Sequence, residues 1–359
     1  MRLTERSRIA ILNTVIRLQM LAGPAIGGVS AGAPFHFSYG GISMSKPFMT
    51  YEQQMQRLKD KHLSIPAGTE QAVKEILRQE GYFALITGYK DLFKNPTTHQ
   101  YQDGTTIEDI LVVYRFDESL RELTLRYLLH IERHIRSVLS YAFCDAFGDG
   151  QDAYLDPRNY NHTRAQNGKE INRLIERYLK PLLDQRTKYP YIEHHKNNHG
   201  NVPLWILINA LTFGTLSKLY SLSSPRVQSV VSKEFSGIQE KQLAQILDVL
   251  TDYRNLCAHN ERIFSHRCAK KDIPDLAIHR KLELPKKGNT YLVGKRDYFA
   301  VVLAFRYLLS RQDFLQYHSQ LTAVLKMIEP INQKITKEEI LHRMGFPENW
   351  QQLKDEFQI

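Results

Sequence analysis

The longest periodic stretch of the chain, from about Thr106 to Phe147, constrains the fold more than any other feature. Its apolar residues recur every three or four positions, which is the spacing of one face of an α-helix. A single helix of this length is unusual in a globular protein, so a break near Asp117 or Ser119 is an alternative. The apolar positions are Ile110, Val113, Leu120, Leu123, Leu128, Ile131, Ile135, Val138, Leu139 and Ala142.

Shorter helices are predicted before and after this stretch. Thr50 with Gln53, and Thr336 with Glu339, have the spacing of a capping box at the start of a helix. A small β-hairpin is predicted around Pro285–Asn289, and strand signals are otherwise few, so the predicted fold class is all-α. Further helices are expected at about 69–80, 170–185, 203–222, 224–235, 297–309 and 312–326, and from Ile238 onward.

A polar segment, Pro190–Val202, is predicted to be a loop that carries His194, His195 and His199. Three imidazoles could bind a metal, but nothing in the sequence fixes their geometry and Glu193 is the only nearby carboxylate. We interpret them as surface histidines and predict neither a metal nor another cofactor. The three cysteines form no zinc-binding or disulfide pattern, which fits a reducing cytoplasm. They are Cys144, Cys257 and Cys268.

Charge and hydropathy limit the kinds of partner that the chain can have. The formal net charge of the 359 residues is +10 at pH 7. This balance favours a polyanion such as nucleic acid, because Lys and Arg displace counterions from phosphates. No run approaches the roughly 18 apolar residues of a membrane span, so no membrane partner is expected.

Residues 1–45 differ in composition from the rest. A basic, amphipathic piece, Arg2–Leu21, precedes a stretch rich in Gly, Ala, Ser and Pro. Glu5 and several arginines interrupt the apolar centre that a signal peptide requires. We expect a poorly ordered extension or a mis-assigned start codon, with Met44 as the candidate true start.

A second helix combines an apolar stripe with a cluster of chemically active residues, Tyr253–Asn260. At about 100° per residue, Asn255 and His259 share the polar face and Arg254 lies at the edge of the stripe, about 140° from His259. One helix therefore builds no compact pocket, and the same motif in another copy of the chain is the candidate for the completing surface. The stripe consists of Leu243, Ile246, Leu250, Tyr253 and Cys257.

These residue types suit metal-independent RNA cleavage. An imidazole can take a proton from the ribose 2′-OH or give one to the leaving 5′-oxygen, and a guanidinium can stabilise the phosphate charge. Asn255 can orient the backbone or the imidazole. The structural alternative is that Arg254 and His259 are five residues apart by chance, with the histidine stabilising the end of its helix.

A charged patch on the long helix allows two interpretations. Glu132 and Arg136 are four residues apart and can pair on a solvated face. Alternatively, the patch contacts phosphates, which makes Arg133 and Arg136 candidate RNA contacts. Arg262, which follows the motif, is a third candidate.

Several separated blocks resemble the Abi-like family of bacterial abortive-infection proteins, the AbiD/AbiF type, whose members are placed in the HEPN superfamily. Their order and spacing make the resemblance specific, and together they cover about Lys46 to Ser265. The blocks are Gly81 to Tyr89, Tyr114 to Arg121, Ile131 to Arg136, Pro203 to Trp205, Phe213 to Ser217 and Arg254 to Asn260.

The resemblance implies a HEPN-like helical bundle, dimerisation, and an endoribonuclease site built from Arg and His of each subunit. Carried over by position, this site is Arg254 and His259 with Asn255 as the polar residue after the arginine. The family also implies defence against phage through RNA cleavage. We therefore expect an Abi-like domain at 46–265 and a mostly helical extension at 266–359 packed on it.

Two other functions remain open at this stage. A non-catalytic HEPN protein would bind RNA or regulate a partner, with the motif helix as a dimer interface. The toxin of a toxin–antitoxin pair would be held by an antitoxin protein or a non-coding RNA. A catalytic protein requires His259 for RNA cleavage, whereas a binding protein does not.

Overall fold

The computed structural model describes residues 47–184, 189–328 and 335–355. The described residues from Met49 onward belong to one compact unit. They are almost entirely helical and contain one two-stranded hairpin, which confirms the all-α class. The expectations for residues 1–45 fall outside the described residues.

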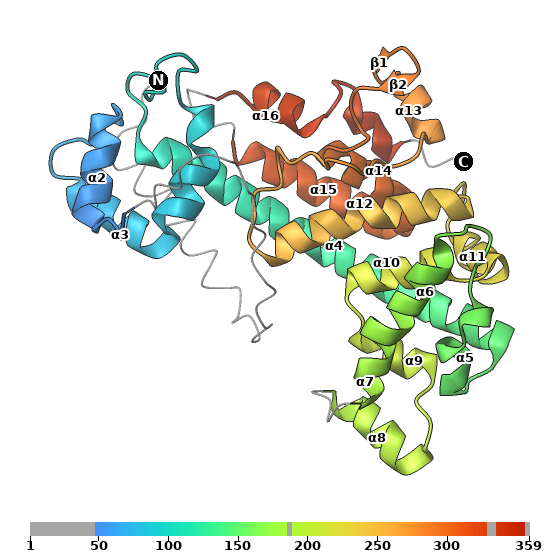
Figure 1. The fold of residues 1–359 in the computed structure, drawn as a ribbon. Coiled ribbons are helices and arrows are strands. Elements are labelled where there is room, and N and C mark those ends of the chain that lie inside the picture. The colour runs from blue at the N-terminus through green and yellow to red at the C-terminus, as the bar shows by residue number, and fades with distance from the viewer. Residues whose placement is uncertain (1–46, 185–188, 329–334, 356–359) are drawn as a thin grey trace. The chain divides into compact units, whose positions relative to one another are not determined.

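The central element is α4, an unbroken helix of 41 residues, Ile107–Phe147 (Figure 1). Its start is fixed by a capping box in which Thr106 and Asp109 each bond to the other's backbone N–H. At 1.5 Å per residue it is about 60 Å long, and it contacts elements that precede it and elements that follow it in the sequence. Because it continues through Asp117 and Ser119, the alternative of a break there is wrong.

Four helices pack along α4 through its buried apolar positions. They are α9 (Leu204–Leu207), α11 (Pro225–Ser232), α12 (Glu240–Ala258) and α15 (Arg311–Lys326). Further helices contribute buried residues to the same core. They are α2 (Tyr51–Asp60), α3 (Glu70–Glu80), α5 (Gln151–Leu155), α6 (Asn167–Leu174), α7 (Lys180–Asp184), α8 (Pro190–His199), α10 (Phe213–Leu222), α13 (Ala277–Lys281) and α16 (Lys337–Met344).

The C-terminal segment shares its core with α4 and α12. Every residue of α14 (Tyr298–Leu308) is buried. The Tyr298 hydroxyl lies 2.7 Å from Thr124 Oγ1 on α4, and the Tyr298 ring packs edge-on against the Tyr253 ring of α12. The hairpin, β1 (Lys286–Lys287) with β2 (Thr290–Tyr291), confirms the predicted turn at Pro285–Asn289.

Two predictions about helices are wrong. The segment after Pro190 is the helix α8, because the proline suits a first helical position and Gly200 closes the end with φ +63°. The predicted helix 203–222 is divided, because Leu211 and Thr212 are extended and Thr212 caps α10 by accepting from the N–H of Thr215.

Irregular helical turns connect the elements. A π-helical turn at Phe83–Thr87 follows α3, and another at Ile175–Leu179 joins α6 to α7. In the described part of the chain, no helix combines the length and apolarity needed to cross a bilayer. The 3₁₀ turns are Lys90–Leu92, Pro157–Asn159, Ile208–Ala210 and Trp350–Lys354.

Candidate functional site

The helix α12 carries the motif and is anchored by its apolar stripe. Leu243, Ile246, Leu250 and Tyr253 are fully buried, and Cys257 is buried at the end of the same stripe. Burial of this face holds the opposite face of α12 toward solvent. The motif is therefore presented by a helix that cannot rotate without exposing core side chains.

The chain leaves α12 through a Schellman motif. The N–H of Glu261 donates to the Leu256 carbonyl over 2.9 Å, and the N–H of Asn260 reaches the Cys257 carbonyl over 3.4 Å. Asn260 occupies the left-handed region with φ +57°, which asparagine tolerates better than most residues. This local geometry places His259 as the last residue in the helical register, with its N–H bonded to the Asn255 carbonyl.

Asn260 is expected to be replaceable by glycine but not by valine. Asn260→Gly should change the free energy of unfolding by less than about 0.5 kcal/mol, because glycine adopts positive φ freely. Asn260→Val should cost about 1–2 kcal/mol, because a β-branched residue is strained there. Urea unfolding of the two variants measures the difference, and equal stabilities would contradict this role of Asn260.

The three predicted catalytic residues differ in exposure. Asn255 and His259 are exposed on the outer face of α12, while Arg254 is half-buried at the edge of the stripe. The Nε atom of Arg254 is buried, and none of the described residues accepts a hydrogen bond from it. Arg254 and His259 therefore stand near the same end of α12, with the guanidinium partly buried and the imidazole exposed.

A buried polar cluster fixes the chain directly after the motif. Asp117 on α4 is fully buried and accepts hydrogen bonds from four donors. They are the Tyr89 hydroxyl at 2.6 Å, Arg121 Nη1 at 2.8 Å, the Phe264 N–H at 2.9 Å and the Ile263 N–H at 3.2 Å. The segment that follows His259 is therefore tied to the N-terminal third of α4.

Burial and charge pairing have opposite effects on the pKa values of Asp117 and Arg121. Burial raises the pKa of the Asp117 carboxyl, while Arg121 and the hydrogen-bond donors act in the opposite direction. Arg121 is also buried, and its pKa is raised by the Asp117 charge against the opposing effect of burial. Asp117 and Arg121 form a buried ion pair, so the loss of either leaves the other buried without its counter-charge.

A small hollow of about 130 Å³ opens beside the motif, between α4 and the end of α12. Arg121 contributes to its wall, and the Nη2 atom of Arg121 has no hydrogen-bond partner among the described residues. Burial raises the pKa of the Cys257 thiol to about 12, which makes it a structural rather than a nucleophilic group. The lining residues are Glu118, Arg121, Glu122, Leu125, Cys257 and Asn260.

The three candidate RNA contacts lie in different settings. Arg136 is half-buried and bonds to Glu132 and, over 2.7 Å, to the Leu211 carbonyl, so the predicted ion pair on this helix face is present. Arg133 is exposed one turn earlier. Arg262 is exposed near the motif and donates to the Gly88 carbonyl. Of the three, only Arg262 therefore lies close to the motif in the sequence. Arg133 and Arg136 lie on another helix, α4.

The histidines of α8 gather on one surface of that helix. The ring centroids of His195 and His199 are 5.1 Å apart, and His194 lies 5.9 Å from each. Within the described ranges, no three His, Cys, Asp or Glu side chains are grouped as metal ligands. The geometry therefore identifies no metal site in that part of the chain.

Sequence reasoning assigned no role to Asp117, Arg121, Tyr89 or Asn260. One signal was available in the sequence. Asp117 and Arg121, an acid and a base four residues apart, stand on the apolar face of the long helix. Their contacts with the 261–264 segment depend on tertiary packing, which periodicity does not reveal.

The comparisons with known proteins place this geometry in a family. The family model described as Abi-like protein matches residues 75–265, which include α4, α12 and the motif. Searches of the curated proteins and of the solved structures find no match. Because the family model covers more than half of the 359 residues, the chain belongs to the Abi-like protein family.

Proposed function

We propose that the protein is a metal-independent endoribonuclease of the HEPN type. Membership of the Abi-like family suggests a role in abortive-infection defence. In this proposal the enzyme cuts RNA during phage infection, and Arg254 and His259 form the catalytic pair. The observation that carries the proposal is the exposed His259 on the same helix as Arg254, whose buried Nε has no partner among the described residues.

The proposed reaction begins with attack of a ribose 2′-oxygen on the adjacent phosphorus. A neutral imidazole accepts the 2′-OH proton, and a second, protonated imidazole donates a proton to the leaving 5′-oxygen. The Arg254 guanidinium binds the phosphate and stabilises the charge that develops on it. The products are a 2′,3′-cyclic phosphate and a 5′-OH, so no water is consumed in this step.

A second copy of the chain supplies the other half of the site. One subunit carries one His259, whereas the reaction uses an acid and a base. The exposed face of α12 presents Asn255 and His259 outward. Two such faces related by a twofold axis bring two His259 and two Arg254 side chains to one cleft. RNA is the substrate, and the formal charge of +10 favours its capture.

Mixed dimers are expected to reveal this shared site. After subunit exchange between equal amounts of wild-type and His259→Ala protein, about a quarter of the cleavage activity should remain, because only dimers of two wild-type subunits are intact. Independent subunits would retain about half, since each wild-type subunit would act alone. Cleavage of a labelled RNA, measured across a series of mixing ratios, distinguishes a shared site from independent subunits.

The exposed His342 on α16 provides the matched control for this mixing series. Mixtures of wild-type and His342→Ala subunits should keep full activity at every ratio. A linear decrease with His259→Ala, or a solution mass of a monomer under active conditions, would contradict the shared site. The assignment of Arg254 and His259 themselves is tested by the single variants described in the Discussion.

A further inference from the structure

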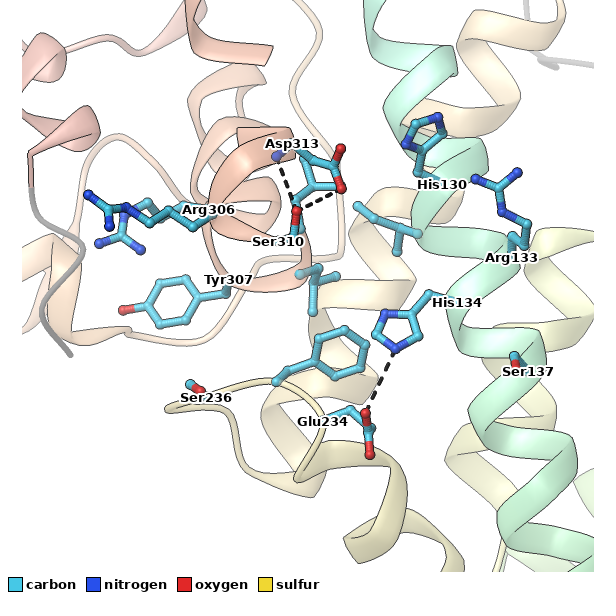
Figure 2. A pocket seen from close by; sticks show the side chains of 15 residues that line it. His130, Arg133, His134, Ser137, Glu234, Ser236, Arg306, Tyr307, Ser310 and Asp313 are labelled. Atoms are coloured by element: carbon cyan, nitrogen blue, oxygen red, sulfur yellow. Dashed lines mark hydrogen bonds and ion pairs between the residues drawn. The ribbon is translucent and has the colours of Figure 1, made fainter. Parts of the chain in front are cut away.

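Two cavities of the described residues adjoin different parts of the fold. The larger has a volume of about 620 Å³ and lies between α4, the turn after α11 and the junction of α14 with α15 (Figure 2). Both carboxylates that line it, Glu234 and Asp313, have partners in the same wall. The smaller is the hollow of about 130 Å³ that is lined by Asn260, the residue directly after His259. The hollow therefore adjoins the proposed catalytic histidine.

The hollow has the size of one planar ring. A cavity of about 150 Å³ in another protein binds benzene, which makes a volume of about 130 Å³ sufficient for the edge of a nucleobase. Leu125 and Cys257 provide apolar contact in its wall. Because consecutive Cα atoms are about 3.8 Å apart, a base beside Asn260 belongs to a nucleotide at or next to the phosphate that His259 serves.

The charge of the hollow disfavours a phosphate. Arg121 is the cation among its lining residues, whereas Glu118 and Glu122 are carboxylates. The charge of Arg121 is already paired, because its Nη1 atom lies 2.8 Å from Asp117. The two glutamates would repel an anion at this short range. The hollow therefore suits the neutral base of a nucleotide rather than its phosphate.

Two polar groups of the wall have no partner among the described residues. Arg121 is 4% exposed, and its Nη2 atom is buried without an acceptor, which is a costly arrangement until a ligand supplies one. The Glu122 carboxylate is exposed and makes no hydrogen bond or ion pair in the described part of the chain. Glu118, in contrast, is held by Arg115 Nη1 over 2.7 Å. One donor nitrogen and one carboxylate are thus left for a ligand.

This pattern of free groups matches guanine better than the other bases. A carboxylate can accept two parallel N–H bonds, and guanine carries N1–H and its 2-amino group side by side, next to the acceptor O6. Cytosine has one donor beside two acceptors, which is the reverse pattern. Adenine and uracil have no two neighbouring donor groups on this edge. Only guanine therefore uses one donor nitrogen and both carboxylate oxygens together.

We infer that the hollow beside the motif binds the edge of a guanine base and sets the sequence preference of the proposed cleavage. Arg121 Nη2 donates to O6, and the Glu122 carboxylate accepts from N1–H and the 2-amino group. Leu125 contacts the face of the base. The inference rests on the proposed function, because it takes RNA as the substrate. It makes Glu122 a specificity-determining residue that takes no part in proton transfer.

Binding of an RNA that cannot be cleaved tests the inference without requiring catalysis. The first probe is a fluorescein-labelled oligouridine with one central guanosine, in which 2′-fluoro groups replace the nucleophilic 2′-hydroxyls. Two further probes carry inosine, which lacks the 2-amino group, or adenosine. The full-length wild-type protein should bind the guanosine probe about tenfold more tightly than the inosine probe, the effect of one hydrogen bond to a charged group. Fluorescence anisotropy gives the dissociation constants.

Glu122→Gln should remove the difference between the guanosine and inosine probes, because an amide keeps one acceptor oxygen and turns N–H donors toward the donors of guanine. The matched control is Glu108→Gln. Glu108 is an exposed glutamate of the same helix, about 21 Å along its axis from Glu122 and outside the hollow. This control should keep the preference of the wild type. Both positions are exposed, so neither substitution removes a core contact.

Equal affinity of the wild-type protein for the guanosine, inosine and adenosine probes would overturn the inference, as would the absence of binding to all three. A preference that survives in Glu122→Gln, or that is lost equally in Glu108→Gln, would also overturn it. Failure of the proposed nuclease is a separate result. A protein that prefers guanosine but leaves RNA uncut retains the pocket, whereas one that cuts RNA without this preference retains only the nuclease.

Discussion

His259→Ala is expected to slow RNA cleavage by at least about a hundredfold, because it removes both the base and the acid of the shared cleft. His259 is exposed at the end of α12, so the substitution removes no core contact. The thermal midpoint should therefore stay within a few degrees of the wild-type value. Initial rates on a labelled RNA, measured at equal protein concentration, give the size of the loss.

Arg254→Ala is expected to slow RNA cleavage by about a hundredfold to a thousandfold. This is the loss expected when a positioned donor to a developing charge is removed. Arg254→Lys should recover only part of the rate, because an ammonium keeps the charge but not the planar fork. His342→Ala and Arg164→Ala, both at exposed positions, are the matched controls. Equal rates for the two motif variants and these controls would remove Arg254 and His259 from the mechanism.

Asp117→Ala is expected to have the largest effect on stability. It leaves Arg121 buried without its counter-charge and removes the acceptor for Tyr89 and for two backbone N–H groups. Breaking a buried ion pair in this way costs about 3–5 kcal/mol. The free energy of unfolding from urea titration should fall by that amount.

The same substitution should also displace the segment after the motif. Asp117 binds the N–H groups of Ile263 and Phe264, so its loss frees the chain that follows His259. We expect RNA cleavage to fall by more than the unfolded fraction explains. Arg343→Ala breaks a pair with the same spacing of four on the exposed α16 and should cost less than about 0.5 kcal/mol. Similar losses of unfolding free energy in Asp117→Ala and Arg343→Ala would contradict the anchoring role of Asp117.

Much of the fold could be predicted because its signals are local. The periodicity of 106–147, the capping box at Thr50 and the N-cap at Thr336 depend on neighbouring residues, and α4, α2 and α16 begin where these signals indicate. The helix α8 was missed because only Ile192 is buried in it, so it has no apolar stripe. The division at Leu211 and Thr212 was missed because no glycine or proline marks it.

The candidate site could be predicted only in part. The faces of α12 follow from angular spacing, and Asn255 and His259 lie on its exposed side. The anchor at Asp117 unites a side chain of α4 with backbone from 263–264, far apart in the sequence. A cavity of about 620 Å³ likewise joins three segments, near 130–137, 234–236 and 306–313. Contacts between distant segments leave no periodic pattern, so structure was required to find them.

The chemistry of the cleavage products tests the central claim most directly. Purified wild-type and His259→Ala proteins are incubated with a labelled RNA in the presence of EDTA, and the new ends are analysed. We predict 2′,3′-cyclic phosphate and 5′-OH ends from the wild-type protein and almost none from His259→Ala. Equal cleavage by both proteins, or wild-type products that end in 3′-OH, would contradict 2′-OH attack at an Arg254/His259 site.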